Sequence, residues 1–169
     1  GVKQNPVGFN RAYVRVEADA SLDQFNQAWA AGRNFVTNGP MLSFKTETGQ
    51  RPGDTIEFPG EGGRLELNVS VTSEQVLTAV EIVVNGQVVK SFDPTDDHEF
   101  TGSAKLQIAQ GSWIAARATA RDDLLTDEEL ALHTNGDRWP KFPERPCRLR
   151  FAHTSPIYVT VDGQSTAVR

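Results

Sequence analysis

The sequence contains very few of the residues that build metal and redox sites. Its 169 residues include one cysteine, Cys147, and three histidines, His98, His133 and His153. A single thiol cannot form an intrachain disulfide or a thiolate metal cluster. No two of the histidines have the H-x-H or H-x-x-x-H spacing that brings two imidazoles to one metal ion. The sequence therefore predicts neither a metal site nor a cofactor.

Positive charge and long apolar runs are also scarce. The chain has 17 Lys and Arg residues against 22 Asp and Glu residues, a net charge of −5 at pH 7. No basic surplus is left to neutralise nucleic-acid phosphates, and no run approaches the ~18 apolar residues of a membrane span. We predict no nucleic-acid partner and no membrane span. Because the chain begins at Gly1 and not at Met, we expect a piece of a longer polypeptide; its compartment is unknown, and a secreted or periplasmic parent fits.

The remaining catalytic patterns are weak. Residues 96–99, D-D-H-E, are the densest group of potential metal ligands, but they follow Pro94 between two predicted strands, and a solvated acidic turn is the favoured interpretation. Ser155 follows His153 by two residues, which places both side chains on one face of an extended segment. No G-x-S-x-G elbow surrounds Ser155, however, and no oxyanion-hole pattern is present. We predict no catalytic residue in this chain.

One segment has a strong helical pattern. Ser21 stands at the N-cap position and Gln24 follows three residues later, as in a capping box, while Gly32 suits the C′ position that ends a helix. Apolar residues recur at helical spacing: Leu22, Phe25, Ala28 and Trp29. We expect this apolar stripe to pack against the core. A short strand is expected before the helix, over residues 11–17.

From Phe35 onward the apolar residues alternate with a period of two, and Gly, Pro, Asn and Asp interrupt them, which is typical of short β-strands. Leu65, Leu67, Val69 and Val71 give the clearest alternation. Asn85-Gly86 fits a type I′ turn that joins two strands into a hairpin. The expected strands are 35–45, 55–58, 65–71, 80–84, 88–92, 103–108, 112–120 and 157–161.

These elements predict a mainly β fold, an immunoglobulin-like two-sheet β-sandwich with one N-terminal α-helix and a long loop before the last strand. Residues 1–34 would be a strand and helix packed on the sandwich, and residues 35–169 the sandwich itself, in one compact unit. An insertion is expected at 121–150, with a short helix from Thr126. Trp139 in this loop is the candidate for an exposed aromatic side chain.

The strand around Trp113 has two different faces. Trp113 and Arg117 lie on one face, and the smaller residues Ile114, Ala116 and Ala118 lie on the other. We expect the smaller face to pack inward, which turns Trp113 and Arg117 toward solvent or a neighbouring domain. The alternative, that Trp113 is the core tryptophan of the sandwich, stays open.

Several phrases carry a resemblance that spans residues 8–161. They are G-F-N-R-A-Y-V at 8–14, G-R-N-F-V-T-N-G-P at 32–40, W-I-A-A-R at 113–117 and A-H-T-S-P-I-Y at 152–158. Together they resemble the C-terminal region of bacterial metallohydrolases of the CehA/McbA type. These enzymes are relatives of the polymerase and histidinol phosphatase (PHP) phosphoesterases, in which a metal-binding catalytic domain precedes a β-rich tail.

The resemblance implies a non-catalytic accessory domain that packs against or positions the upstream catalytic domain of the same polypeptide. The family's metal ligands belong to that upstream domain, so no active-site residue is assigned here. We expect a polar cluster, as a structural or interface element, near the strand ends: Arg33, Asn38, Arg117, His153 and Thr154. The alternative function is a carbohydrate or cell-surface binding module, which predicts a row of exposed aromatic side chains.

Overall fold

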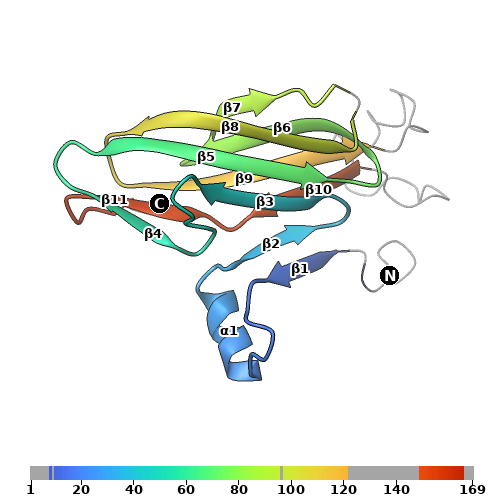
Figure 1. Ribbon diagram of the computed structural model, residues 1–169, viewed down its shortest axis with the longest axis horizontal. Coiled ribbons are helices and arrows are strands. Elements are labelled where there is room, and N and C mark those ends of the chain that lie inside the picture. Colours follow the sequence, from blue (N-terminus) through green and yellow to red (C-terminus); the bar gives the residue numbers. More distant parts are fainter. Residues whose placement is uncertain (1–7, 9, 96, 122–148, 166–169) are drawn as a thin grey trace, which may run out of the picture.

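The computed structural model describes residues 8, 10–95, 97–121 and 149–165. These residues form a mainly β fold with one helix and two sheets (Figure 1). The larger sheet contains β1 (Arg11–Val14), β2 (Asn34–Thr37), β4 (Thr55–Phe58), β6 (Val76–Val84), β7 (Gln87–Phe92), β9 (Ser112–Arg121), β10 (Leu149–Thr154) and β11 (Ile157–Val161). The smaller sheet contains β3 (Met41–Thr46), β5 (Gly63–Thr72) and β8 (Glu99–Ile108). The predicted mainly β, two-sheet architecture with one helix is confirmed.

Strand β9 organises the larger sheet. It pairs with β6 along one edge, and with β10 and then β11 along the other. Beyond β10 the sheet continues through β2 to β1, and beyond β11 it ends at β4. The β11–β4 pair is parallel, whereas the other strand pairs are antiparallel. In the smaller sheet, β5 lies between β3 and β8.

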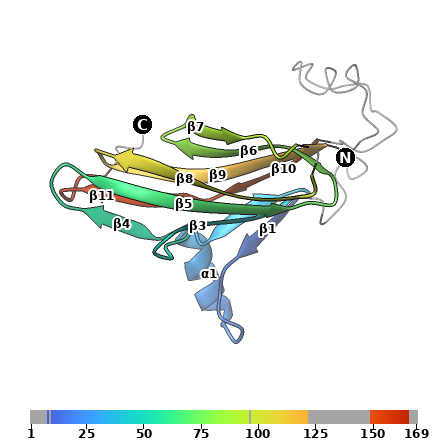
Figure 2. The ribbon, with the colours of Figure 1, turned by 45° about the horizontal axis from the view of Figure 1, so that its top comes forward.

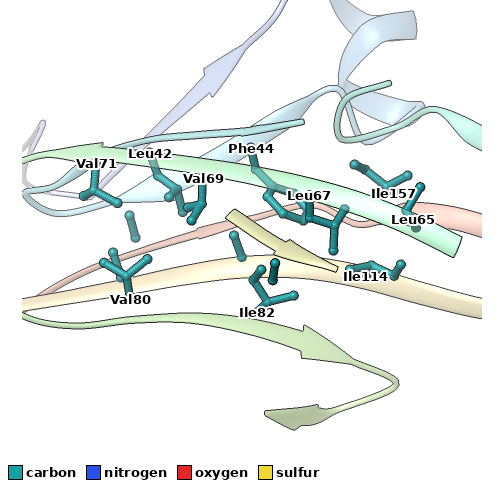
Figure 3. Close-up of a cluster of buried hydrophobic side chains, with 14 of the residues drawn as sticks. Leu42, Phe44, Leu65, Leu67, Val69, Val71, Val80, Ile82, Ile114 and Ile157 are labelled. Atoms are coloured by element: carbon teal, nitrogen blue, oxygen red, sulfur yellow. The ribbon is translucent and has the colours of Figure 1, made fainter. Parts of the chain in front are cut away.

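The core lies between the two sheets (Figures 2 and 3). On β9, Ile114, Ala116 and Ala118 are at most 1 % exposed, which confirms the predicted inward face. On β5, the alternating side chains of the expected strand are all buried: Leu65, Leu67, Val69 and Val71. Small side chains on β9 leave space for the larger side chains that face them. Full burial of each Leu, Ile or Val contributes about 1.5–3 kcal/mol.

Helix α1 (Leu22–Ala30) begins as predicted. The Ser21 hydroxyl accepts a hydrogen bond from the Gln24 amide, and the Gln24 side chain accepts one from the Ser21 amide. Gly32 has a φ of +73° at the C-terminal end. The expected core packing of the apolar stripe is wrong, because among its residues only Ala28 is buried. Figures 1 and 2 both show α1 projecting away from the two sheets, next to β1.

The segment 35–45, expected to be one strand, forms two strands in different sheets. β2 ends at Thr37 and β3 begins at Met41. Between them the Thr37 hydroxyl accepts a hydrogen bond from the Gly39 amide at 2.9 Å and donates one to the Pro40 carbonyl at 2.6 Å. Pro40 has no amide hydrogen to offer a sheet ladder, so the chain leaves one sheet at this point and enters the other.

The Asn85-Gly86 hairpin is confirmed: both residues have positive φ, +50° and +84°, between β6 and β7. Strand β10 was not among the predicted strands. Arg121 ends β9, and Leu149 starts β10. The rest of the expected insertion, including the helix from Thr126, lies outside the described residues, as does Trp139. Within the described part of the chain, no helix is long and apolar enough to cross a membrane.

Candidate functional site

Two residues of the expected polar cluster, Thr154 and Asn38, are buried and hold strands together. Thr154 is 4 % exposed, and its hydroxyl accepts a hydrogen bond from the Ala116 amide at 3.1 Å. This bond lies where β9 changes partner from β10 to β11, so the hydroxyl takes the place of a strand carbonyl. The Asn38 side-chain oxygen accepts a hydrogen bond from the Phe151 backbone amide at 2.7 Å, and the backbone amide of Asn38 donates one to the Phe151 carbonyl at 3.1 Å.

Arg117 and His153 lie opposite each other on β9 and β10, on the outer face of the larger sheet. The Arg117 guanidinium donates to the carboxylate of Glu81, its neighbour on β6. The Arg117 side chain is 50 % exposed, so solvent screens this ion pair and it contributes little to stability. The five expected residues therefore do not form a single cluster. Arg33, the fifth residue, lines a groove together with Thr154. This groove lies on the inner side of the larger sheet, the side that faces the smaller sheet.

This groove, which we name the open-edge groove, has a volume of about 280 Å³ and lies between β1, β2 and β3. It arises because the two sheets differ in width. The smaller sheet ends at β3, whereas the larger sheet extends past β10 to β2 and β1 (Figure 1). The inner face of β1 and β2 consequently has no described strand opposite it.

The walls of the open-edge groove are aromatic and aliphatic. Tyr13 on β1 and Phe35 on β2 are direct cross-strand partners, and their rings stack with centroids 5.1 Å apart and an interplanar angle of 10°. Leu42 and Phe44 of β3 form the other wall. Tyr13 is 37 % exposed, so a large apolar side chain borders solvent here.

The rim of the open-edge groove is positively charged. Arg15, Arg33 and Arg51 line it, and among the described residues no Asp or Glu does. The Asp54 carboxylate forms an ion pair with one of these arginines, at 3.3 Å from the Arg15 guanidinium. A local concentration of three cationic side chains in a chain of net charge −5 favours an anionic occupant.

Exposed apolar side chains on α1 form a second feature, the α1 apolar surface: Leu22, Phe25 and Trp29 are 74 %, 37 % and 49 % exposed. The rings of Phe25 and Trp29 are 6.2 Å apart and tilted. Behind the helix, a more polar depression of about 610 Å³ lies between α1, the segment that follows β1, and Asp54. Arg15 and Arg33 line this depression as well as the open-edge groove.

The outer face of the larger sheet carries a third feature, aromatic side chains that we name the outer aromatic face: Trp113, Phe151 and Tyr158. Trp113 and Tyr158 are direct cross-strand partners. Tyr158 and Phe151 are each 42 % exposed, and Trp113 is half-buried. Phe151 lies opposite Thr119 on β9, six residues from Trp113, which is about 20 Å along a strand.

Ser155 and His98, which carry potentially catalytic side chains, form structural hydrogen bonds. The Ser155 hydroxyl donates a hydrogen bond to the Asn34 side chain at 2.9 Å. His98 is exposed, and its amide donates to the Asp97 carboxylate. Among the described residues, no group of three or more His, Cys, Asp or Glu side chains is placed to hold a metal ion.

Comparison of the chain with known protein families, with curated proteins and with solved structures finds no match. Function is therefore inferred from the three surface features and from the phrases quoted from the sequence. The alternating pattern over 35–45 predicts one strand and so does not reveal the open-edge groove, which lies between the two strands β2 and β3. The pair Gly39-Pro40 is the signal that could have separated β2 from β3.

Proposed function

We propose that this chain is a non-catalytic, immunoglobulin-like accessory domain of a PHP-like metal-dependent hydrolase, and that it binds the catalytic domain upstream in the same polypeptide. The α1 apolar surface is the observation that supports this proposal most. Three large apolar side chains on one short helix are exposed to solvent. Aromatic residues in such a position are enriched at the centres of protein interfaces.

The helix itself needs a partner. Nine residues are too few for a stable isolated helix in water, and most helices gain their stability from packing of an apolar face. Here only Ala28 of α1 is buried, and the helix packs mainly against β1. A neighbouring domain that covers Leu22, Phe25 and Trp29 would supply the missing contacts.

The position of α1 fits an upstream partner. β1 and α1 are the first two described elements, so a domain that precedes them in the polypeptide would join the chain at the start of β1, one short strand and one loop before this surface (Figure 1). A covalent tether gives an effective concentration in the millimolar range for short linkers. A small apolar surface is then enough to hold two domains together.

The test is a double substitution, Phe25→Ser with Trp29→Ser, made both in this chain and in the full parent polypeptide. In the parent, we expect wild-type amide hydrogen exchange in α1 to be at least about 10-fold slower than in the isolated chain, because the interface opposes local opening. The double variant should lose this protection. In the isolated chain, stability should change by no more than about 0.5 kcal/mol per exposed site.

The matched control is Val88→Ser with Val89→Ser, two side chains on β7 that are 44 % and 45 % exposed. This control should leave the protection of α1 in the parent unchanged. Equal exchange of α1 in the parent and in the isolated chain would contradict the proposal. A parent reading frame without a metal-binding domain before this chain would do the same.

A second function, carbohydrate binding, is supported by the outer aromatic face. Sugar rings stack on exposed aromatic side chains, and Tyr158 and Phe151 are available for such stacking. On this hypothesis the chain binds at least one oligosaccharide on a glycan array, and Tyr158→Ala lowers that affinity about 10-fold or more, whereas Phe25→Ala has no effect. Absence of glycan binding at millimolar ligand would remove this candidate.

A further inference from the structure

Strand β3 has a free edge. Among the described strands it pairs with β5 alone. The Glu47 amide donates to the Glu66 carbonyl at 2.9 Å, which continues the β3–β5 ladder by one hydrogen-bonded pair. Since hydrogen-bonded and non-bonded pairs alternate in an antiparallel ladder, the backbone groups of Leu42 and Phe44 point away from β5. The Thr46 amide follows the same alternation and donates to the Gln50 carbonyl instead.

This free edge borders the open-edge groove. Leu42, Ser43 and Phe44 all line it. The amide and carbonyl groups of Leu42 and Phe44 therefore face a hollow whose far wall is the Tyr13–Phe35 stack. An unpaired strand edge of this kind is a template for pairing with another extended segment.

The positive charge around the free edge of β3 favours binding of an acidic segment. Arg15, Arg33 and Arg51 surround the groove, and Lys45 lies exposed on the same strand as the free backbone groups. Guanidinium groups bind carboxylates with two parallel hydrogen bonds, which makes them suited to Asp and Glu side chains. Within the described part of the chain, Arg15 is the one of these four cations that forms an ion pair, with Asp54 at 3.3 Å.

We propose that the open-edge groove binds an extended acidic peptide segment of a partner protein, which adds to the free edge of β3 as a further strand. Backbone hydrogen bonds to Leu42 and Phe44 provide affinity, as in other cases of strand addition. Alternate side chains of the peptide pack on Tyr13 and Phe35. The carboxylates of the peptide's acidic residues, next to these side chains in its sequence, bind the arginines of the rim. This interaction is separate from the proposed contact of α1 with the catalytic domain, and it is tested on the isolated chain.

The probe is the peptide acetyl-Glu-Val-Glu-Val-Glu-amide, titrated into the ¹⁵N-labelled chain. We expect saturable binding with a dissociation constant below about 1 mM, and amide shifts concentrated at Leu42, Ser43 and Phe44. Two altered peptides separate the contributions. The peptide with Lys in place of Glu should bind at least about 10-fold more weakly, because it repels the arginine rim. The peptide N-methylated at both Val residues should also lose at least about 10-fold, because it cannot donate strand hydrogen bonds.

Charge reversal on the protein completes the test. Arg33→Glu and Arg51→Glu should each weaken binding of the acidic peptide about 10-fold or more. Arg64→Glu is the matched control: this exposed arginine on β5 does not line the groove, and its variant should bind within about twofold of the unaltered chain. Equal binding of the N-methylated peptide would overturn strand addition. Equal losses in the Arg33 and Arg64 variants, or no shifts at β3, would overturn the groove as the binding site.

Discussion

Replacement of Thr154 by valine is expected to lower the free energy of unfolding by about 1–3 kcal/mol, the cost of a buried polar group that loses its partner. Valine keeps the shape of threonine, but it removes the hydroxyl oxygen that accepts the Ala116 amide hydrogen. Ala116 is fully buried on β9, so water cannot replace this acceptor. Urea denaturation monitored by tryptophan fluorescence measures the change. For a chain of this size, it corresponds to a fall in Tm of roughly 2–12 °C.

The matched control is Thr101→Val on β8. Thr101 is exposed, so loss of its hydroxyl leaves no buried donor without a partner, and we expect a change within about 0.5 kcal/mol. Equal losses for Thr101 and Thr154 would show that the Thr154 hydroxyl does not stabilise the junction of β9, β10 and β11. A structural role for Thr154 also separates it from Arg117, whose half-exposed ion pair with Glu81 contributes at most about 1 kcal/mol.

Features with a local cause could be predicted from the sequence. The capping box joins Ser21 and Gln24, which are three residues apart, and the hairpin turn needs only Asn85 and Gly86 in positive φ. The face of β9 that carries Ala116 could be assigned because side chains alternate strictly along a strand. Each of these predictions needs information from fewer than about ten neighbouring residues, because the forces that decide them act over that range.

Features that depend on sheet order could not be predicted. The open-edge groove exists because the larger sheet extends past β3, and its rim combines Arg15, Arg33 and Arg51 from three separate segments. No short pattern records how two sheets of different width overlap. The apolar residues of α1 show the same limit of prediction from the sequence. Their spacing revealed an apolar face on α1 but could not tell whether that face meets the core or solvent.

The two depressions beside β1 are connected through shared side chains. Arg15 and Arg33 line both the open-edge groove and the polar depression behind α1. Arg15 also pairs with Asp54, which lines only the second of these. A peptide carboxylate that binds Arg15 in the groove would compete with Asp54. Binding in the groove would therefore break one ion pair beside α1, whereas the proposed domain contact uses the apolar side chains Leu22, Phe25 and Trp29 and none of these cations.

Replacement of Gly62 by alanine is expected to cost about 3–5 kcal/mol, from backbone strain and steric overlap together. Gly62 has a φ of +89°, outside the range that alanine adopts readily. A Cβ atom at this position would overlap the Ile108 carbonyl oxygen and lie 2.9 Å from the Ala109 Cα. Both are backbone atoms next to the Gly63–Ile108 pair that joins β5 to β8, so relief would require one strand of the core to move.

Gly60→Ala separates the two causes of this loss. Gly60 also has a positive φ, +62°, but a Cβ there would meet nothing within 4 Å. The left-handed conformation costs alanine about 1–2 kcal/mol, and the smaller entropy of the unfolded alanine chain offsets part of it. We therefore expect Gly60→Ala to lose less than about 1.5 kcal/mol in the same denaturation experiment. If both variants lost the same amount, strain alone would explain the result, and close packing of the Gly62 backbone against the end of β8 would not be required for stability.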